Sequence, residues 1–169
     1  MEGAASGGAG GQQAVAPEQL AFFPRLHGAH PTAWCFPAYL DNPNCEWLQA
    51  IKDLYAQKIT FPASLSPEAG LFLHSMIRNF KPRTIVEIGS FLSVSTHWMA
   101  AALKENGIPP GDGVIHCFDD FGPIHKGPWR DVEMRTGREA FVRERLTAAG
   151  LLDFVRLRLG LDFVMRAAK

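Results

Sequence analysis

The sequence predicts an α/β fold in which a parallel sheet has helices on both faces. Two observations point to this class. Short apolar stretches at residues 84–88, 114–118 and 154–160 have the length and residue types of strands. Segments with apolar residues at helical spacing lie between them, and strands that alternate with helices are typical of a parallel sheet.

The whole chain divides into three parts. Residues 1–18 are rich in Gly and Ala and are expected to form a disordered tail. Residues 19–65 are expected to form a strap and one helix, and 66–169 a partial cofactor-binding domain. The aromatic and proline-rich stretch 20–43 could cover a substrate pocket or pack on a partner, but an irregular strap over the core is the simpler interpretation.

Two helices are predicted before the first strand. Asn44 is expected to cap one of them, and Ser66 is expected to cap the other, with Pro67 in its first turn. Lys81 and Pro82 should end the second helix. The expected core stripes are Trp47, Ile51, Leu54 and Tyr55 in the first helix, and Leu73, Ile77 and Phe80 in the second.

The strand at 84–88 ends in a tight turn that is the most informative part of the sequence. Glu87 lies near the strand end, Gly89 breaks the strand, and a helix is expected to begin near Ser95. Gly89 permits backbone angles and close approaches that a side chain would block. The free N–H groups of the helix start would then face the space above the sheet edge, where a small polar cofactor could bind.

The second strand is predicted at 114–118, and Asp119 ends it. In doubly wound sheets an acid at this place accepts hydrogen bonds from the two hydroxyls of a ribose. Asp120 follows in the loop, and the alternative is that either acid only caps that loop. A helix over 139–149 with Gly150 at its end should follow, and then a strand whose polar face carries Arg156 and Arg158, as suits a sheet edge.

Composition limits the classes of partner. The chain has 169 residues, of which 47% are hydrophobic, and its 17 basic and 17 acidic side chains balance. The balance gives no electrostatic reason to expect nucleic acid or an anionic membrane as a partner. No apolar run approaches the ~20 residues that span a bilayer, and the N-terminus has no secretory signal.

The cysteines and histidines indicate neither a disulfide framework nor a metal site. Cys35, Cys45 and Cys117 have no paired spacing, so free thiols in the cytoplasm are expected. His116 and Cys117 are neighbours in a strand and therefore point to opposite faces, so they are not expected to share an ion. We expect no bound metal.

These motifs carry a family resemblance. The pattern E-x-G-x-x-x-G-x-S, followed by an acid at the end of the next strand, resembles class I S-adenosylmethionine-dependent methyltransferases. The resemblance is greatest to the O-methyltransferases that act on small molecules. It covers about residues 66–160 and implies a Rossmann-like fold with sheet order 3-2-1-4-5-7-6. Ser93 stands where the family has its second glycine, and it adds a side chain where the backbone would pass close to the cofactor.

The resemblance also implies roles for single residues. Glu87 would hold the ammonium group of S-adenosylmethionine directly or through water, and Asp119 would bind the ribose. The methionine end would lie against Gly89, Ser90, Ser93 and Ser95. A nicotinamide cofactor is a weaker alternative, because residues 89–95 lack the G-x-G-x-x-G pattern that cradles a pyrophosphate.

In this fold four more strands would follow the third. We therefore expect a methyltransferase fold truncated after its third parallel strand, namely the cofactor-binding half of an enzyme that transfers a methyl group to a small-molecule acceptor. The alternative is a non-catalytic binding or interaction module with the same fold. Strand 84–88 would have an open edge, which could pair with a second copy or with a partner chain.

Overall fold

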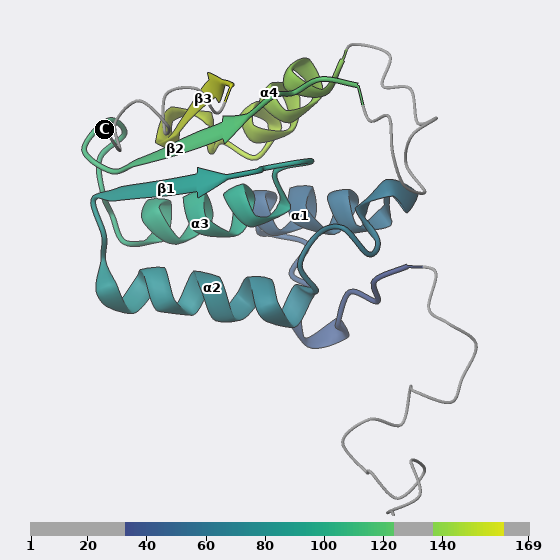
Figure 1. Ribbon diagram of the computed structural model, residues 1–169. Helices are drawn as coiled ribbons and strands as arrows, with labels where there is room; N and C mark the ends of the chain where they lie inside the picture. Colours follow the sequence, from purple (N-terminus) through teal and green to yellow (C-terminus); the bar gives the residue numbers. More distant parts are fainter. Residues whose placement is uncertain (1–32, 124–136, 161–169) are drawn as a thin grey trace, which may run out of the picture. The chain divides into compact units, whose positions relative to one another are not determined.

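The computed structural model describes residues 33–123 and 137–160. The three strands in this part of the chain form one parallel sheet in the order β1-β2-β3 (Figure 1). They are β1 Thr84–Ile88, β2 Val114–Asp119 and β3 Val155–Leu159. All of them lie where the sequence predicts strands, and β3 occupies the outer position that its alternating arginines indicated.

Four α-helices lie in the described residues. They are α1 Glu46–Ala56, α2 Pro67–Phe80, α3 Val94–Glu105 and α4 Arg138–Ala148. Short 3-10 turns are η2 Ala38–Leu40, η3 Lys58–Thr60 and η5 Leu152–Phe154. In the described segments, every helix is too short or too polar to span a lipid bilayer.

The two predicted helix caps have different outcomes. Ser66 caps α2 as predicted, because its Oγ accepts a hydrogen bond from the backbone N–H of Ala69 at 3.2 Å. The prediction that Asn44 caps α1 is wrong, since the N-cap is Cys45 and no side chain caps this helix. Instead, the backbone N–H of Asn44 donates to Oδ1 of Asn42 at 3.0 Å, so the asparagine turn lies before the helix.

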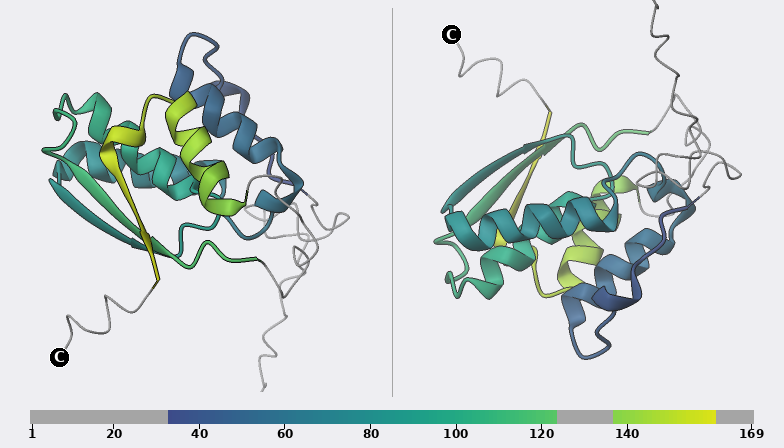
Figure 2. Two further views of the ribbon diagram at one scale, coloured as in Figure 1. Left: turned by 90° about the horizontal axis from the view of Figure 1, so that it is seen from above. Right: turned by 90° about the horizontal axis from the view of Figure 1, so that it is seen from below.

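The described helices pack on one face of the sheet (Figure 2). The connections β1–α3–β2 and β2–α4–β3 step across the sheet in the same direction. Because such connections are right-handed, both place their helix on the same side. The sequence analysis expected helices on both faces of the sheet. In residues 33–123 and 137–160, however, no helix covers the second face. The pattern of polar and apolar residues in the strands did not predict that helices cover only one face.

The two faces of the sheet therefore differ in burial. On the helix-covered face, Ile115 and Cys117 are fully buried and Val155 is 4% exposed. On the other face, which we call the open face, Val86 is 60% exposed and Ile88 is 57% exposed. The core lies between the sheet and α3, α4 and η5.

A second buried cluster surrounds Trp98 of α3 and joins it to α1 and α2. The Trp98 indole N–H donates to the Tyr55 hydroxyl at 3.1 Å. A β-carbon at Gly70 would lie 2.0 Å from Trp98 Nε1, so only glycine allows α2 to approach this closely. Trp34 and Phe36 pack against the same cluster, as expected for a strap over the core; the rest of that stretch, up to residue 32, lies outside the described residues.

Candidate functional site

The carboxyl ends of β1 and β2 meet at one edge of the sheet and border a depression. The strands are in parallel register, with Ile88 beside Phe118, and the backbone N–H of Gly89 donates to the Phe118 carbonyl at 2.8 Å. The depression has a volume of about 310 Å³, near the lower end of small-molecule sites. Its lining residues are Ile88, Gly89, Phe91, Phe118, Asp119, Asp120 and Arg138.

The turn from β1 into α3 has an unusual backbone. Gly89 has φ 79°, Phe91 has φ 50° and Ser93 has φ 64°, all in the left-handed region. For the two non-glycine residues this conformation costs on the order of 1–3 kcal/mol each, and such strain is concentrated at functional sites. From the sequence, a serine at position 93 was expected to cost little if its backbone angles were ordinary; its φ is instead in the left-handed region, so a glycine would relieve the backbone angle.

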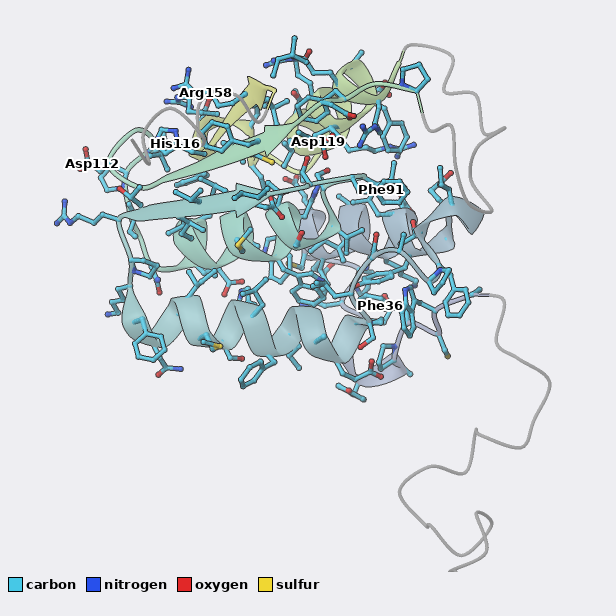
Figure 3. The ribbon with its side chains drawn as sticks, viewed as in Figure 1. Phe36, Phe91, Asp112, His116, Asp119 and Arg158 are labelled. Atoms are coloured by element: carbon cyan, nitrogen blue, oxygen red, sulfur yellow. The ribbon has the colours of Figure 1, made fainter. Side chains whose placement is uncertain are left out.

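Asp119 holds the turn and the β2 end together (Figure 3). Its Oδ2 accepts from the backbone N–H of Phe91 at 2.9 Å and from the Ser90 hydroxyl at 3.3 Å. Its Oδ1 accepts from the backbone N–H of Phe121 at 2.9 Å and pairs with Arg138 Nη2, also at 2.9 Å. The carboxylate is thus buried and fully engaged by its neighbours.

Arg138 is a functional candidate that the sequence analysis missed. It is the first residue of α4, its side chain is only 10% exposed, and it pairs with both Asp119 and Asp120. The guanidinium also lies 5.8 Å from the ring centroid of Phe121. A cation at a helix N-terminus is unfavourable by itself. An arginine there, after a strand that ends in two acids, was the available signal for this ion pair.

Glu87 lies on the helix-covered face, away from Asp119. Its Oε2 accepts from the Thr96 hydroxyl at 2.5 Å and from the Cys117 thiol at 3.1 Å, and its Oε1 accepts from the Ser95 hydroxyl. Burial, with the Glu87 charge next to it, raises the pKa of the Cys117 thiol to about 12, so Cys117 remains a proton donor to Glu87.

Five of the six predicted site residues form two groups, and Ser93 lies apart from both. Gly89, Ser90 and Asp119 come together at the depression, where Ser90 bonds to Asp119. Glu87 and Ser95 bond to each other between β1 and α3. Ser93 is fully buried at the N-terminus of α3, and its hydroxyl donates to the Leu92 carbonyl at 2.5 Å.

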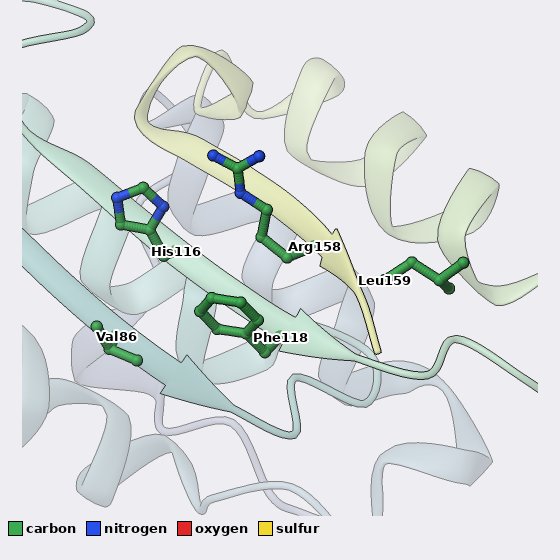
Figure 4. A pocket seen from close by; sticks show the side chains of 5 residues that line it. All are labelled: Val86, His116, Phe118, Arg158 and Leu159. Carbon is green, nitrogen blue, oxygen red and sulfur yellow. The ribbon is translucent and has the colours of Figure 1, made fainter. Parts of the chain in front are cut away.

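Two other depressions lie close to this edge. One, of about 490 Å³, is on the open face (Figure 4) and is lined by Val86, His116, Phe118, Arg158 and Leu159. The other, of about 460 Å³, adjoins the start of α4 and shares Asp120 and Arg138 with the candidate site. In the described part of the chain, no group of three or more His, Cys, Asp or Glu side chains could hold a metal ion.

Comparisons with known proteins identify the fold. No family model matches the chain, and no curated protein matches it. Among solved structures, the O-methyltransferase TomG from Streptomyces achromogenes, in complex with SAM, is 21% identical with a TM-score of 0.50. The match covers 78% of this chain and 49% of that chain.

Two further solved structures give the same result. An O-methyltransferase from Bacillus cereus, in complex with SAH, is 21% identical over 75% of this chain and 48% of that chain, with a TM-score of 0.50. A methyltransferase from Geobacter sulfurreducens is 19% identical over 78% of this chain and 57% of that chain, with a TM-score of 0.51. The chain spans about half the length of these structures, and the described residues share their Rossmann-like fold.

Proposed function

We propose that this chain forms the cofactor-binding part of an S-adenosylmethionine-dependent methyltransferase that transfers a methyl group to an oxygen atom of a small molecule. The observation that carries the proposal is the strained glycine turn beside the acidic end of β2, with a depression between them. The same fold occurs in solved methyltransferases in complex with SAM or SAH.

The residues at the depression suit an adenosyl cofactor. Gly89 lines it, and a β-carbon there would meet no atom within 4 Å, so the open space above the turn is available to a ligand. The acids that end β2 supply oxygen acceptors for ribose hydroxyls, and Phe91 and Phe118 add apolar walls for an adenine ring. Glu87 would act at the methionine end through Ser95, because its carboxylate is engaged inside the protein.

The bound cofactor would supply an electrophilic methyl group on a sulfonium. The chain's own contribution would be to hold the cofactor in place, because positioning is a major part of such a displacement. We expect the isolated chain to have little methyltransferase activity toward phenols, catechols or sugars, since it spans only about half the length of the solved methyltransferases that it matches.

A non-catalytic interaction module is the second candidate function. The open face and the unpaired edge of β1 favour it, because within the described residues β1 pairs only with β2. An exposed strand edge can pair with a second copy or with a partner chain.

The three cysteines are free thiols, which supports a cytoplasmic location.

Calorimetric titration of the full chain with S-adenosylhomocysteine, S-adenosylmethionine and NAD tests the first proposal. We expect the two adenosyl compounds to bind more tightly than NAD. Gly89→Ala should abolish or strongly weaken this binding, since its β-carbon enters the open space and strains the turn.

Gly107→Ala is the matched control for this test. Gly107 also has positive φ and empty space around it, but it lies at the other end of α3, so its substitution brings similar strain away from the site. Tighter binding of NAD, or equal loss of binding in both variants, would contradict the proposal.

A further inference from the structure

We propose that His97 of α3 is a positioning residue for the cofactor site. Its imidazole holds the backbone of Ser93, and through Ser93 it fixes the turn that borders the depression. This assignment rests on the proposed function. It concerns a fully buried side chain that lies outside the lining of the depression, so His97 would act on a ligand only through the turn.

Ser93 needs a restraint from another residue because its own backbone is in an unfavourable region. Its φ of 64° and ψ of 24° are left-handed, and a residue with a β-carbon adopts this region roughly ten- to a hundredfold less often than its ordinary conformations. Ser93 is the N-cap of α3, yet its hydroxyl makes no capping bond and donates to the Leu92 carbonyl instead. The serine side chain therefore does not stabilise the helix start as an N-cap normally does.

His97 supplies that restraint. The Ser93 carbonyl accepts two hydrogen bonds from it, one from the backbone N–H at 2.9 Å and one from the imidazole Nδ1–H at 2.7 Å. Burial lowers the pKa of His97 to about 4, so the ring is neutral at pH 7. A neutral imidazole has a single N–H, and the nitrogen that faces a carbonyl is the one that carries it.

Ser93 is connected in turn to the lining of the depression. Its backbone N–H donates to the Ser90 carbonyl at 2.6 Å, which closes a tight turn. Within that turn, the backbone N–H of Phe91 and the Ser90 hydroxyl donate to Asp119. If Ser93 relaxed to an ordinary conformation, the chain would leave this turn in another direction and the Phe91 contact to Asp119 would loosen. Loss of the imidazole bond should therefore weaken cofactor binding.

Two substitutions that place an N–H differently separate positioning from packing. The asparagine amide nitrogen is as many bonds from Cα as imidazole Nδ1, so His97→Asn keeps a donor for the Ser93 carbonyl. The glutamine amide nitrogen corresponds to Nε2, so His97→Gln is closer in size to histidine but moves the donor. We expect His97→Gln to weaken binding of S-adenosylhomocysteine about five- to tenfold, and His97→Asn to stay within about twofold of the wild type. A role in packing alone predicts the opposite order, because asparagine leaves the larger cavity.

A second substitution tests whether the effect passes through Ser93. Glycine adopts the left-handed backbone without steric cost, so in a Ser93→Gly chain the added His97→Gln change should weaken binding by less than about twofold. Leu103→Ala is the control, since Leu103 is fully buried on α3 away from the turn. It should lower the melting temperature but leave the affinity for S-adenosylhomocysteine unchanged at a temperature where the chain is folded.

The amide NMR signals of Gly89 and Phe91 in the ligand-free chain give a readout that does not depend on cofactor binding. They should be single in the wild type and in His97→Asn, and doubled or broadened in His97→Gln. A wild-type chain that binds no S-adenosylhomocysteine would overturn the proposed function, whereas these signals would still decide whether His97 holds the turn.

Several results would overturn the assignment. They are wild-type affinity or wild-type turn signals in His97→Gln, a greater loss of affinity in His97→Asn than in His97→Gln, and an equal effect of His97→Gln in the wild-type and Ser93→Gly chains. A His97→Gln chain that does not fold would also overturn it, because the ring would then be needed for packing. If His97→Asn does not fold, the comparison in the wild-type and Ser93→Gly chains decides alone.

Discussion

The helix-covered face and the open face of the sheet are made from alternate residues of the same strands, and they have become different environments. In β1, Glu87 points to the covered face and is 9% exposed, whereas its neighbours Val86 and Ile88 are more than half exposed. In β2, Cys117 is fully buried, whereas His116 lines the depression on the open face. The open face is thus apolar along β1, carries His116 and Arg158 on β2 and β3, and is uncovered in the described residues.

This comparison shows what positions the candidate site. The covered face contains the polar network of Glu87 and the packing around Trp98, which fix α3 against the sheet. The site lies at the strand ends, between the two faces, and depends on α3 and α4 for the Gly89 turn and for Arg138. We therefore expect stability to depend mainly on the covered face and association with other chains mainly on the open face.

The largest expected effect is that of Trp98→Ala on the covered side. Trp98 is fully buried between α1, α2 and α3, so its removal should reduce the free energy of unfolding by about 3–5 kcal/mol. Urea denaturation measures this loss. Phe72→Ala is the control, because Phe72 is 67% exposed on α2; similar losses in both variants would contradict the account.

The pH dependence of stability should also originate partly on the covered side. Burial lowers the pKa of His97 to about 4, and its Nδ1–H donates to the Ser93 carbonyl at 2.7 Å. Since an unfolded histidine has a pKa of about 6.5, the unfolded chain takes up a proton first as the pH falls. Stability should therefore decrease between about pH 6.5 and pH 4, by about 3 kcal/mol for this group.

Unfolding measurements at pH 7 and pH 5 on the wild type and His97→Gln isolate this contribution. The variant should lose less stability than the wild type on acidification. If both lose the same amount, the buried neutral histidine is not responsible.

A smaller effect is expected for Ser93→Gly at the glycine turn. Glycine relieves the left-handed backbone, but it also removes the Ser93 hydroxyl bond to Leu92 and adds freedom to the unfolded chain. The net change in the free energy of unfolding should lie between zero and about 1 kcal/mol in favour of the variant. Affinity for S-adenosylhomocysteine should be unchanged or higher. A marked loss of binding in a folded variant would show that the hydroxyl itself contributes to the site.

The smallest effect on stability is expected for Val86→Lys on the open face. Val86 is 60% exposed, so the free energy of unfolding should change by no more than about 0.5 kcal/mol. The added charge should reduce self-association, which light scattering detects as a smaller mean particle mass. Unchanged association would show that the open face is not the contact surface.

The sequence predicted the parts of the fold that local patterns determine. The strand at Thr84–Ile88, the Asp119 strand end and the Ser66 cap follow from short-range residue types, and the structure contains all of them. The placement of the helices on one face depends instead on the handedness of two crossovers. Asn44 and Cys45 could not be distinguished as caps, because Asn42 forms the competing turn.

The candidate site was only partly predictable for a related reason. Gly89 and Asp119 lie close to each other because adjacent parallel strands end together, which the strand pattern implies. The engagement of Asp119 by Phe91, Phe121 and Arg138 depends on contacts from three segments. No single segment of the sequence contains that information.

The most direct test of the central claim is an NMR titration of the isotope-labelled full chain with S-adenosylhomocysteine. We predict that the shifted amide signals belong to the strand ends and the glycine turn, with Gly89, Phe91 and Asp120 among them, while His116 and Arg158 on the open face keep their positions. Shifts confined to the open face, or no shift at millimolar ligand, would contradict the claim that this sheet edge binds an adenosyl cofactor.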